Sequence, residues 1–297
     1  RDGTLIGSEI QMSDASLASR VPDVVWTGDA FALLWGDSRA LPAGDVYLRN
    51  VDAGGIPHGA EVQVTTEGVN AMYVSAVWTG SEFGVTWTDN RDGTMDVYFA
   101  RVTADGAVSG DVTRLIDAAG NSFRPEVVHT GDSFIIVWDD TVGGETWEPH
   151  IHLAILDSSG TVTEAPRIVS NSSSTANRAT AAWSGSLLGA CWEDFGDGLR
   201  EIYCATFDVS GAEQTAPTRI SSTDGASSAA SLVHSPDGFA LAWAMEDGAP
   251  NDDEVRFALL SDTLEVTGAD AALTDTAGEP VSLSLIWTGA GYALSYV

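Results

Sequence analysis

Six small polar or acidic residues recur along the chain, each three positions before a repeated turn motif that contains glycine. They are Asp23, Ser75, Glu126, Thr180, Ser231 and Ser284. Residues at one register position of successive inner strands line the axis of a closed ring, where such side chains hold ordered water. The carboxylates of Asp23 and Glu126 are also ligands that hard cations prefer, so bound calcium is the alternative to a water-filled channel.

Arginines close to carboxylates recur in two loops. The pairs are Asp37 with Arg39 and Asp89 with Arg91, followed downstream by Asp45 and Asp96. This spacing predicts an arginine held between two carboxylates, which pins a loop. Exposed ion pairs of this kind contribute about 0–1 kcal/mol each, so they shape loops more than they stabilise the fold.

The loop near residues 141–149 departs most from the repeat. Trp147 lies outside the register of the other tryptophans, beside Glu148, and His150 and His152 follow at i and i+2 on one strand face. Two imidazoles so spaced, with Glu148 nearby, can ligate a transition metal, and a solvated strand end is the plainer alternative. We predict a ligand-binding face that includes Arg39, Arg91, Trp147 and Glu148.

The two cysteines are predicted to face each other. If Trp192 pairs with Tyr203 across a hairpin, Cys191 lies opposite Cys204, within reach of a disulfide. Such a bond requires an oxidising compartment. Two reduced, buried thiols are the alternative.

No catalytic constellation stands out. The chain lacks a Gly-x-Ser-x-Gly motif and a phosphate-binding loop, so no catalytic residue is predicted. A calcium-dependent hydrolase or lactonase would need a cation at the channel mouth, for which Asp23 and Glu126 are the only acids of the inner ring. A carbohydrate-binding propeller that uses Trp147 is a further alternative.

Charge excludes a nucleic-acid partner. The 297 residues carry 13 basic and 43 acidic side chains, a net charge of −30, and every basic one is arginine. With 44% apolar and 19% charged residues, the chain can bury a core, which excludes disorder. The acidic, lysine-free composition is typical of salt-exposed (halophilic) proteins, and codon bias would give the same signature. No apolar stretch is long enough to span a bilayer, and nothing at Arg1 resembles a signal peptide.

A repeat organises these residues. Its six anchors begin at Trp26, Trp78, His129, Trp183, His234 and Trp287, 51 to 54 residues apart. After each anchor come an apolar segment that ends in an aromatic residue and a polar loop; in the complete units a β-rich segment, a turn and a short fourth strand follow. No sustained helical period is present. The pattern predicts an all-β, six-bladed propeller of four-stranded antiparallel blades.

The expected blade boundaries follow the anchors. An N-terminal strand is expected to complete the last blade, as its outer strand. The boundaries are about 8–13 for that strand and about 21–66, 73–116, 125–170, 179–221, 230–274 and 282–297 for blades one to six.

The repeat resembles known propeller sequences. The segment from His234 to Trp243 looks like the WD-like repeat of TolB-type propellers, and the segment from Trp87 to Tyr98 is similar to the second half of that unit. The Trp-Thr-Gly version more closely resembles uncharacterised repeat propellers of secreted and surface proteins of bacteria. The resemblance implies the propeller fold, and TolB-type propellers are periplasmic and act through protein partners.

An even repeat without catalytic motifs predicts a non-catalytic binding or scaffold propeller of a bacterial protein that is secreted, periplasmic or on the cell surface. We expect a monomer that binds a protein or a glycan, with no nucleic acid and no membrane insertion.

Overall fold

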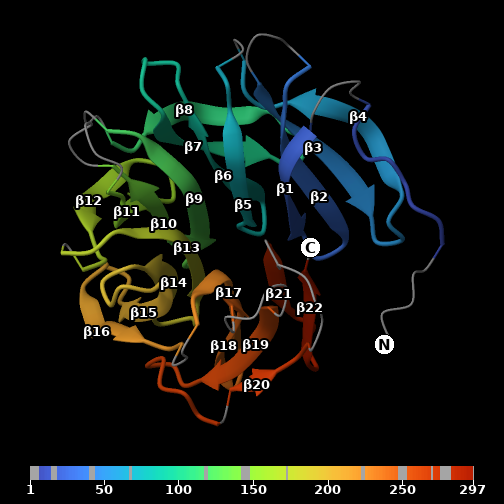
Figure 1. Cartoon of the computed structure of the whole chain (residues 1–297). Coiled ribbons are helices and arrows are strands. Elements are labelled where there is room, and N and C mark those ends of the chain that lie inside the picture. Colours follow the sequence, from blue (N-terminus) through green and yellow to red (C-terminus); the bar gives the residue numbers. More distant parts are fainter. Residues whose placement is uncertain are drawn as a thin grey trace.

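The computed structural model describes residues 7–14, 19–39, 44–66, 69–116, 120–141, 148–171, 173–221, 225–246, 253–268, 270–274 and 282–296. Short antiparallel strands surround a central axis, and the sheets follow one another around a disc in chain order (Figure 1). The described part of the chain contains no helix long and apolar enough to cross a membrane.

Five four-stranded sheets form blades, each with its strands in chain order. Blade one contains β1 (Ser19–Trp26), β2 (Ala30–Asp37), β3 (Asp45–Asp52) and β4 (Pro57–Gln63). Blade two contains β5 (Met72–Trp78), β6 (Glu82–Asp89), β7 (Asp96–Thr103) and β8 (Val108–Arg114). Blade three contains β9 (Ser122–His129), β10 (Ser133–Asp140), β11 (His150–Asp157) and β12 (Val162–Ile168). Blade four contains β13 (Ala176–Trp183), β14 (Leu188–Asp194), β15 (Glu201–Phe207) and β16 (Glu213–Arg219). Blade five contains β17 (Ser227–Ser235), β18 (Gly238–Glu246), β19 (Asp253–Leu260) and β20 (Ala271–Ala272).

The sixth unit is smaller than the others. It consists of β21 (Leu283–Trp287) and β22 (Tyr292–Tyr296), which pair with each other, and β21 packs beside β17. The expectation of six four-stranded blades is therefore corrected to five such blades and a two-stranded sheet. At the sixth anchor, Trp287, the described residues form the hairpin of β21 and β22.

The N-terminal strand expected at residues 8–13 does not complete the last blade. Residues 7–14 instead run beside blade one, where Met12 O accepts a hydrogen bond from Arg49 Nη1 at 2.7 Å. The N–H of Asp14 donates to Glu61 Oε1 at 2.5 Å in the same blade. The physical reason is that, in the described ranges, β22 pairs with β21 alone, so an outermost strand finds no third strand there to pair with.

Five of the six anchors end an inner strand, and in blade five β17 runs one residue past the anchor His234; the turn into the second strand follows. Gly28 and Gly80 adopt left-handed φ values of 109° and 100°, which favour glycine. The hydroxyl of Thr27 donates to Ala30 O at 2.9 Å, closing the turn. The Trp-Thr-Gly motif therefore recurs because one residue ends the strand and the next two build the turn.

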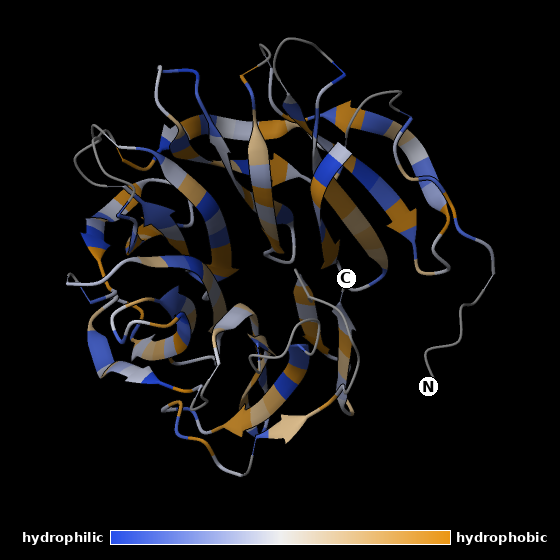
Figure 2. Ribbon diagram, in the orientation of Figure 1, coloured by the Kyte–Doolittle hydropathy of each residue, from blue (hydrophilic) through white to orange (hydrophobic). Residues whose placement is uncertain are grey.

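Apolar side chains between blades form the core. The tryptophans that lie two or three residues before the ends of the second strands are buried, as the sequence predicts: Trp35, Trp87, Trp138, Trp192 and Trp243. Figure 2 shows hydrophobic segments along the strands, β2 among them, with hydrophilic residues at many turns.

Side-chain sizes match across the joints between blades. The Cα of Gly84 faces the ring of Phe134 in the next blade, and Gly189 faces Phe239 in the same way. At the joint between blades three and four, Ile135 stands at the position of the two glycines and Leu188 at the position of the two phenylalanines, and both belong to one buried cluster. A large residue on one blade therefore accompanies a small one on its neighbour, which keeps the joints closely packed.

Candidate functional site

The inner strands enclose an open cavity of about 620 Å³ on the axis of the disc. Its lining comes from all five blades and the sixth sheet, and the polar side chains in it include Asp23, Tyr73, Arg124, Glu126 and Arg178. Because the cavity is the larger of the two best-formed hollows in the described chain, it is the candidate ligand site.

A β-bulge places one residue of each inner strand at the mouth of this cavity. The register shifts just before the ring residue in all five blades. The bulged residues have φ values of 47° to 53°, and they are Val21, Tyr73, Arg124, Arg178 and Ala229. A positive φ is costly for residues that are not glycine, and bulges often occur beside binding sites, where they re-aim a side chain.

Blades three and four add a buried acid behind the bulge. Arg124 donates to Asp139 through Nε at 3.2 Å and Nη2 at 2.5 Å. Arg178 lies 3.7 Å from Glu193, and Glu193 also accepts the backbone N–H of Ala229 at 2.9 Å. The two acids directly follow the buried tryptophans of their blades, at a position that is glycine, threonine or alanine in the other three. Arginine and acid therefore occur together in these two blades alone of the five.

Burial perturbs the carboxyl groups of the site. It raises the pKa of Asp139 to about 6, against the opposing effect of Arg124. Burial raises the pKa of Glu126 to about 8, and the nearby charge of Asp23 adds to the effect. The pKa of Asp23 itself is raised by burial, although two backbone N–H groups oppose this. Near neutral pH, the floor of the cavity therefore carries a protonated Glu126.

The predicted channel ring has a structural role that the sequence analysis missed. Five of its six side chains accept a hydrogen bond from a backbone N–H of the next blade or sheet, at 2.8 to 3.3 Å. The bonds run from Ala76 to Asp23, Val127 to Ser75, Ala181 to Glu126, Leu232 to Thr180 and Leu285 to Ser231. We call these bonds the inter-blade latches. The sixth ring residue, Ser284, is exposed.

The channel cation stays a prediction. Within the described ranges, no group of three or more His, Cys, Asp or Glu side chains gathers closely enough to hold a metal ion. Asp23 and Glu126 remain the two acids of the ring. Both oxygens of Asp23 already accept a backbone N–H, and Glu126 accepts one through Oε1.

Arg39 and Arg91 lie away from the cavity lining. Arg39 donates to Asp37 and Glu61, with its guanidinium 4.1 Å from the ring centroid of Tyr47. Arg91 donates to Asp89 and lies 4.5 Å from the ring centroid of Tyr98.

The expected second carboxylates have other partners. Asp45 accepts from Thr65 at 2.8 Å, and Asp96 accepts from Arg114 at 2.9 Å. The prediction that Asp45 holds Arg39 and that Asp96 holds Arg91 is therefore wrong. Each arginine pins its loop with one nearby aspartate and the face of a tyrosine, and Arg39 gains a second acid from the outer strand.

The other predicted ligand residues are placed only in part. Trp147 lies outside the described residues, and Glu148 is exposed just before β11. His152 is buried, stacks on Trp138 with 5.7 Å between ring centroids, and has a pKa lowered by burial. His150 lies across from Asp140 in the strand register.

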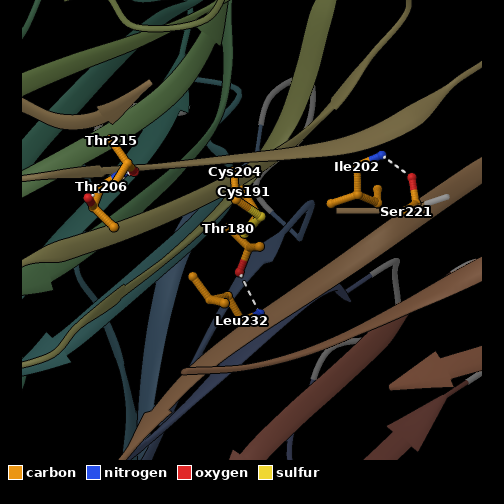
Figure 3. Close-up of a disulfide and its surroundings, with 8 residues drawn as sticks. All are labelled: Thr180, Cys191, Ile202, Cys204, Thr206, Thr215, Ser221 and Leu232. Carbon is orange, nitrogen blue, oxygen red and sulfur yellow. Dashed lines mark hydrogen bonds between the residues drawn. A yellow bond between two sulfur atoms is a disulfide. The ribbon is translucent and has the colours of Figure 1, made fainter. Parts of the chain in front are cut away.

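Cys191 and Cys204 form a disulfide across β14 and β15, the pairing that the sequence indicated. Figure 3 shows this bond beside Thr180, whose hydroxyl accepts the inter-blade latch from Leu232. Thr180 is also the register partner of Cys191. The disulfide therefore braces β14, which pairs with the strand that carries Thr180 of the channel ring.

Sequence reasoning missed Tyr73, Arg124 and Arg178 as site residues. The signal was present, because each stands two positions before a ring residue. Blades one and five have valine and alanine there. Residues two apart on a strand share a face, so plain alternation already places these three side chains on the channel side with the ring residues. A left-handed bulge beside them leaves no trace in hydrophobic periodicity.

Solved structures with the same fold were found, all with low sequence identity. A subtype N10 neuraminidase-like protein of A/little yellow-shouldered bat/Guatemala matches with a TM-score of 0.61 and 11% identity, over 90% of this chain and 85% of that one. An alpha-L-arabinanase of Penicillium chrysogenum complexed with arabinobiose matches with a TM-score of 0.58 and 10% identity, over 91% and 90%. An endo-arabinase of Bacteroides thetaiotaomicron matches with a TM-score of 0.50 and 12% identity, over 79% and 91%.

These likenesses establish a β-propeller with repeated blades. No protein-family model and no curated protein matches the chain, so the resemblance to TolB-type propellers rests on the repeat residues alone. The expectation of a non-catalytic scaffold is wrong by this comparison, because the similar propellers include an arabinanase and an endo-arabinase. The even repeat misled the prediction, since repetition reports blade packing and not the chemistry at the axis.

Proposed function

We propose that this chain is a carbohydrate-binding propeller that holds a saccharide at the channel mouth. The observation that carries the proposal is the break in the repeat at the bulge. Three consecutive blades place Tyr73, Arg124 and Arg178 around a cavity of about 620 Å³, at a position that valine and alanine occupy in blades one and five.

The chemistry of these side chains suits a sugar. The ring of Tyr73 can contact the apolar face of a pyranose or furanose, and it lies 5.9 Å from the guanidinium of Arg124. Arginine supplies several donors in a fixed fork, which suits neighbouring hydroxyl oxygens. The similar fold of an alpha-L-arabinanase complexed with arabinobiose supports a sugar as the ligand.

Binding to a panel of polysaccharides tests the proposal. Affinity electrophoresis in gels that contain arabinan, pectin, xylan or glucan should retard the native chain in at least one. Y73A should lose most of that retardation, whereas H58A, on the outer strand β4, should not. A native chain that none of the gels retards contradicts the proposal.

Glycoside hydrolysis is a second candidate, favoured by one observation. Asp23 and Glu126 both line the cavity, both have raised pKa values, and the charge of one affects the other. A protonated Glu126 beside an ionisable Asp23 is the pairing of acid and base that glycoside hydrolysis uses. Release of reducing ends from the polysaccharide that binds, lost in E126Q while binding persists, is the expected result. Binding without release leaves the chain a carbohydrate-binding protein.

The disulfide supports a proposal about the compartment. We propose an oxidising location, outside the cytoplasm, because a buried cross-strand disulfide between Cys191 and Cys204 persists where thiols are not kept reduced.

A further inference from the structure

The residue at the bulge position differs between blades. It is apolar in blades one and five and arginine in blades three and four. All five bulged residues share nearly the same φ, so the bulge itself does not require arginine. Val21 and Ala229 show that a small apolar side chain satisfies the packing. The arginines of blades three and four therefore call for an explanation other than the fold.

Arg124 and Arg178 differ in how far their donors are engaged. Arg124 makes two hydrogen bonds to the buried Asp139 and is about three-quarters buried. The side chain of Arg178 is 49% exposed, and Glu193 Oε1 lies 3.7 Å from it, beyond hydrogen-bond distance. Glu193 in turn accepts from the N–H of Ala229. Arg178 therefore presents donors toward the cavity that the described residues do not occupy with a hydrogen bond.

The surroundings favour a negative group beside Arg178. An arginine fork matches a carboxylate in two parallel, charge-assisted hydrogen bonds, which are about twice as strong as neutral ones. Glu126, which lines the same cavity, has a pKa raised to about 8 by burial, so near neutral pH it is protonated and does not repel an anion there. Asp139 and Glu193 are buried behind the arginines and each faces one of them.

We propose that the saccharide bound at the channel mouth is an acidic one, a uronic acid, whose carboxylate pairs with Arg178. The inference rests on the proposed carbohydrate binding and specifies its ligand class. Tyr73 contacts the sugar ring, and Arg124, fixed by Asp139, is a positioning residue that holds the Tyr73 side of the mouth.

Matched ligands test this inference directly. Short oligomers of α-1,4-linked galacturonate are compared with the same oligomers as methyl esters, which keep the shape and lose the charge, and with neutral arabinan oligomers. Short chains are used because a protein of net charge −30 repels a long polyanion. Isothermal titration calorimetry on the whole chain should give about 10- to 100-fold tighter binding of the free acid than of the ester.

Three variants locate the effect. R178Q should bind acid and ester equally, with an unchanged melting temperature, because the described residues accept no hydrogen bond from the Arg178 side chain. Y73A should weaken binding of acid and ester by the same factor. R167Q, which removes an arginine of β12 on the rim of the disc, should keep the preference of the native chain.

The outcomes separate this inference from the proposal beneath it. Equal binding of acid and ester by the native chain, or tighter binding of arabinan, overturns the uronate assignment and leaves carbohydrate binding standing. A preference that R167Q abolishes as fully as R178Q also overturns it, because the effect then comes from overall charge. If the native chain binds none of the oligomers, both the uronate assignment and the carbohydrate-binding proposal are wrong. A preference that only R178Q abolishes supports the assignment.

Discussion

Replacing Gly84 with alanine should loosen the joint between blades two and three. Gly84 lies in β6 with a φ outside the left-handed region, so alanine fits its backbone. An alanine Cβ would, however, lie 2.4 Å from Cε1 and 2.8 Å from Cδ1 of Phe134. Carbon atoms in contact normally lie about 3.5–4.0 Å apart, so the buried ring has to move by roughly 1 Å.

Two opposing effects set the magnitude. Overpacking a close-packed core costs about 1–3 kcal/mol. Alanine restricts the unfolded chain and returns about 0.4–1 kcal/mol. The collision exceeds the entropic gain because Phe134 is almost fully buried and has little room to turn. We therefore expect G84A to lower the free energy of unfolding by about 1–2 kcal/mol.

A double-mutant cycle isolates the joint. F134L removes the atoms that the new methyl group meets, so G84A/F134L should be more stable than the sum of the single changes predicts, by about 1 kcal/mol. At the next joint, Leu188 stands at the position of Phe134 and Ile135 at the position of Gly84, so leucine there accompanies a side chain larger than glycine. G268A is the control, because no atom lies within 4 Å of the Cβ that it adds.

Urea unfolding followed by tryptophan fluorescence measures all four variants, with the slope checked for constancy. The reasoning is refuted if G84A is as stable as the native chain. It is also refuted if the coupling between the two substitutions is zero while G268A stays within about 0.5 kcal/mol of the native chain.

Three further predictions concern the disulfide, pH and calcium. Replacing Cys191 and Cys204 together with alanine should cost about 2–4 kcal/mol in urea unfolding, since the bond closes a loop with a sequence separation of 13, and a loss below about 1 kcal/mol would contradict this. Because the native chain keeps a proton on Glu126 between pH 4.5 and about 8 that the unfolded chain releases, stability should fall as pH rises through that window. The loss should be about 2 kcal/mol, less than the full shift implies because water reaches the cavity, and a slope that E126Q leaves unchanged would assign it elsewhere. Calcium beside Asp23 and Glu126 predicts that a chelator lowers the melting temperature and that elemental analysis finds the ion. An unchanged melting temperature, together with no ion in the elemental analysis, would exclude calcium bound beside Asp23 and Glu126.

Much of the architecture could be predicted because it depends on local, repeated chemistry. Trp26 and Trp78 end strands because the following threonine and glycine build a turn that recurs after His129 and Trp287, with serine in place of threonine after Trp183. The facing positions of Cys191 and Cys204 follow from pairing Trp192 with Tyr203, which fixes the register of the whole hairpin.

The site could not be predicted in the same way, because it depends on how far strands shift and turn. The bulges that aim Tyr73 and Arg178 at the axis insert one residue into each inner strand without changing its composition. The inter-blade latches could not be predicted from the sequence for another reason. A serine, threonine or carboxylate at the axis reads equally well as a cation ligand or as an acceptor for a backbone N–H, and only the placement of the next blade decides.

The inter-blade latches also bear on how such a molecule changes its number of blades. Each latch joins a side chain of one blade to the main chain of the next, so the contact is head-to-tail. The side-chain oxygen accepts a backbone N–H, a group that nearly every residue has. A head-to-tail contact sets no limit on the number of units, and the rotation between neighbours alone decides where the ring closes. Duplication or loss of a 51- to 54-residue unit would leave every joint chemically intact. The latches thus make the blade an exchangeable unit of evolution, while residues such as Arg178 can diverge in one copy without disturbing the joint that holds it.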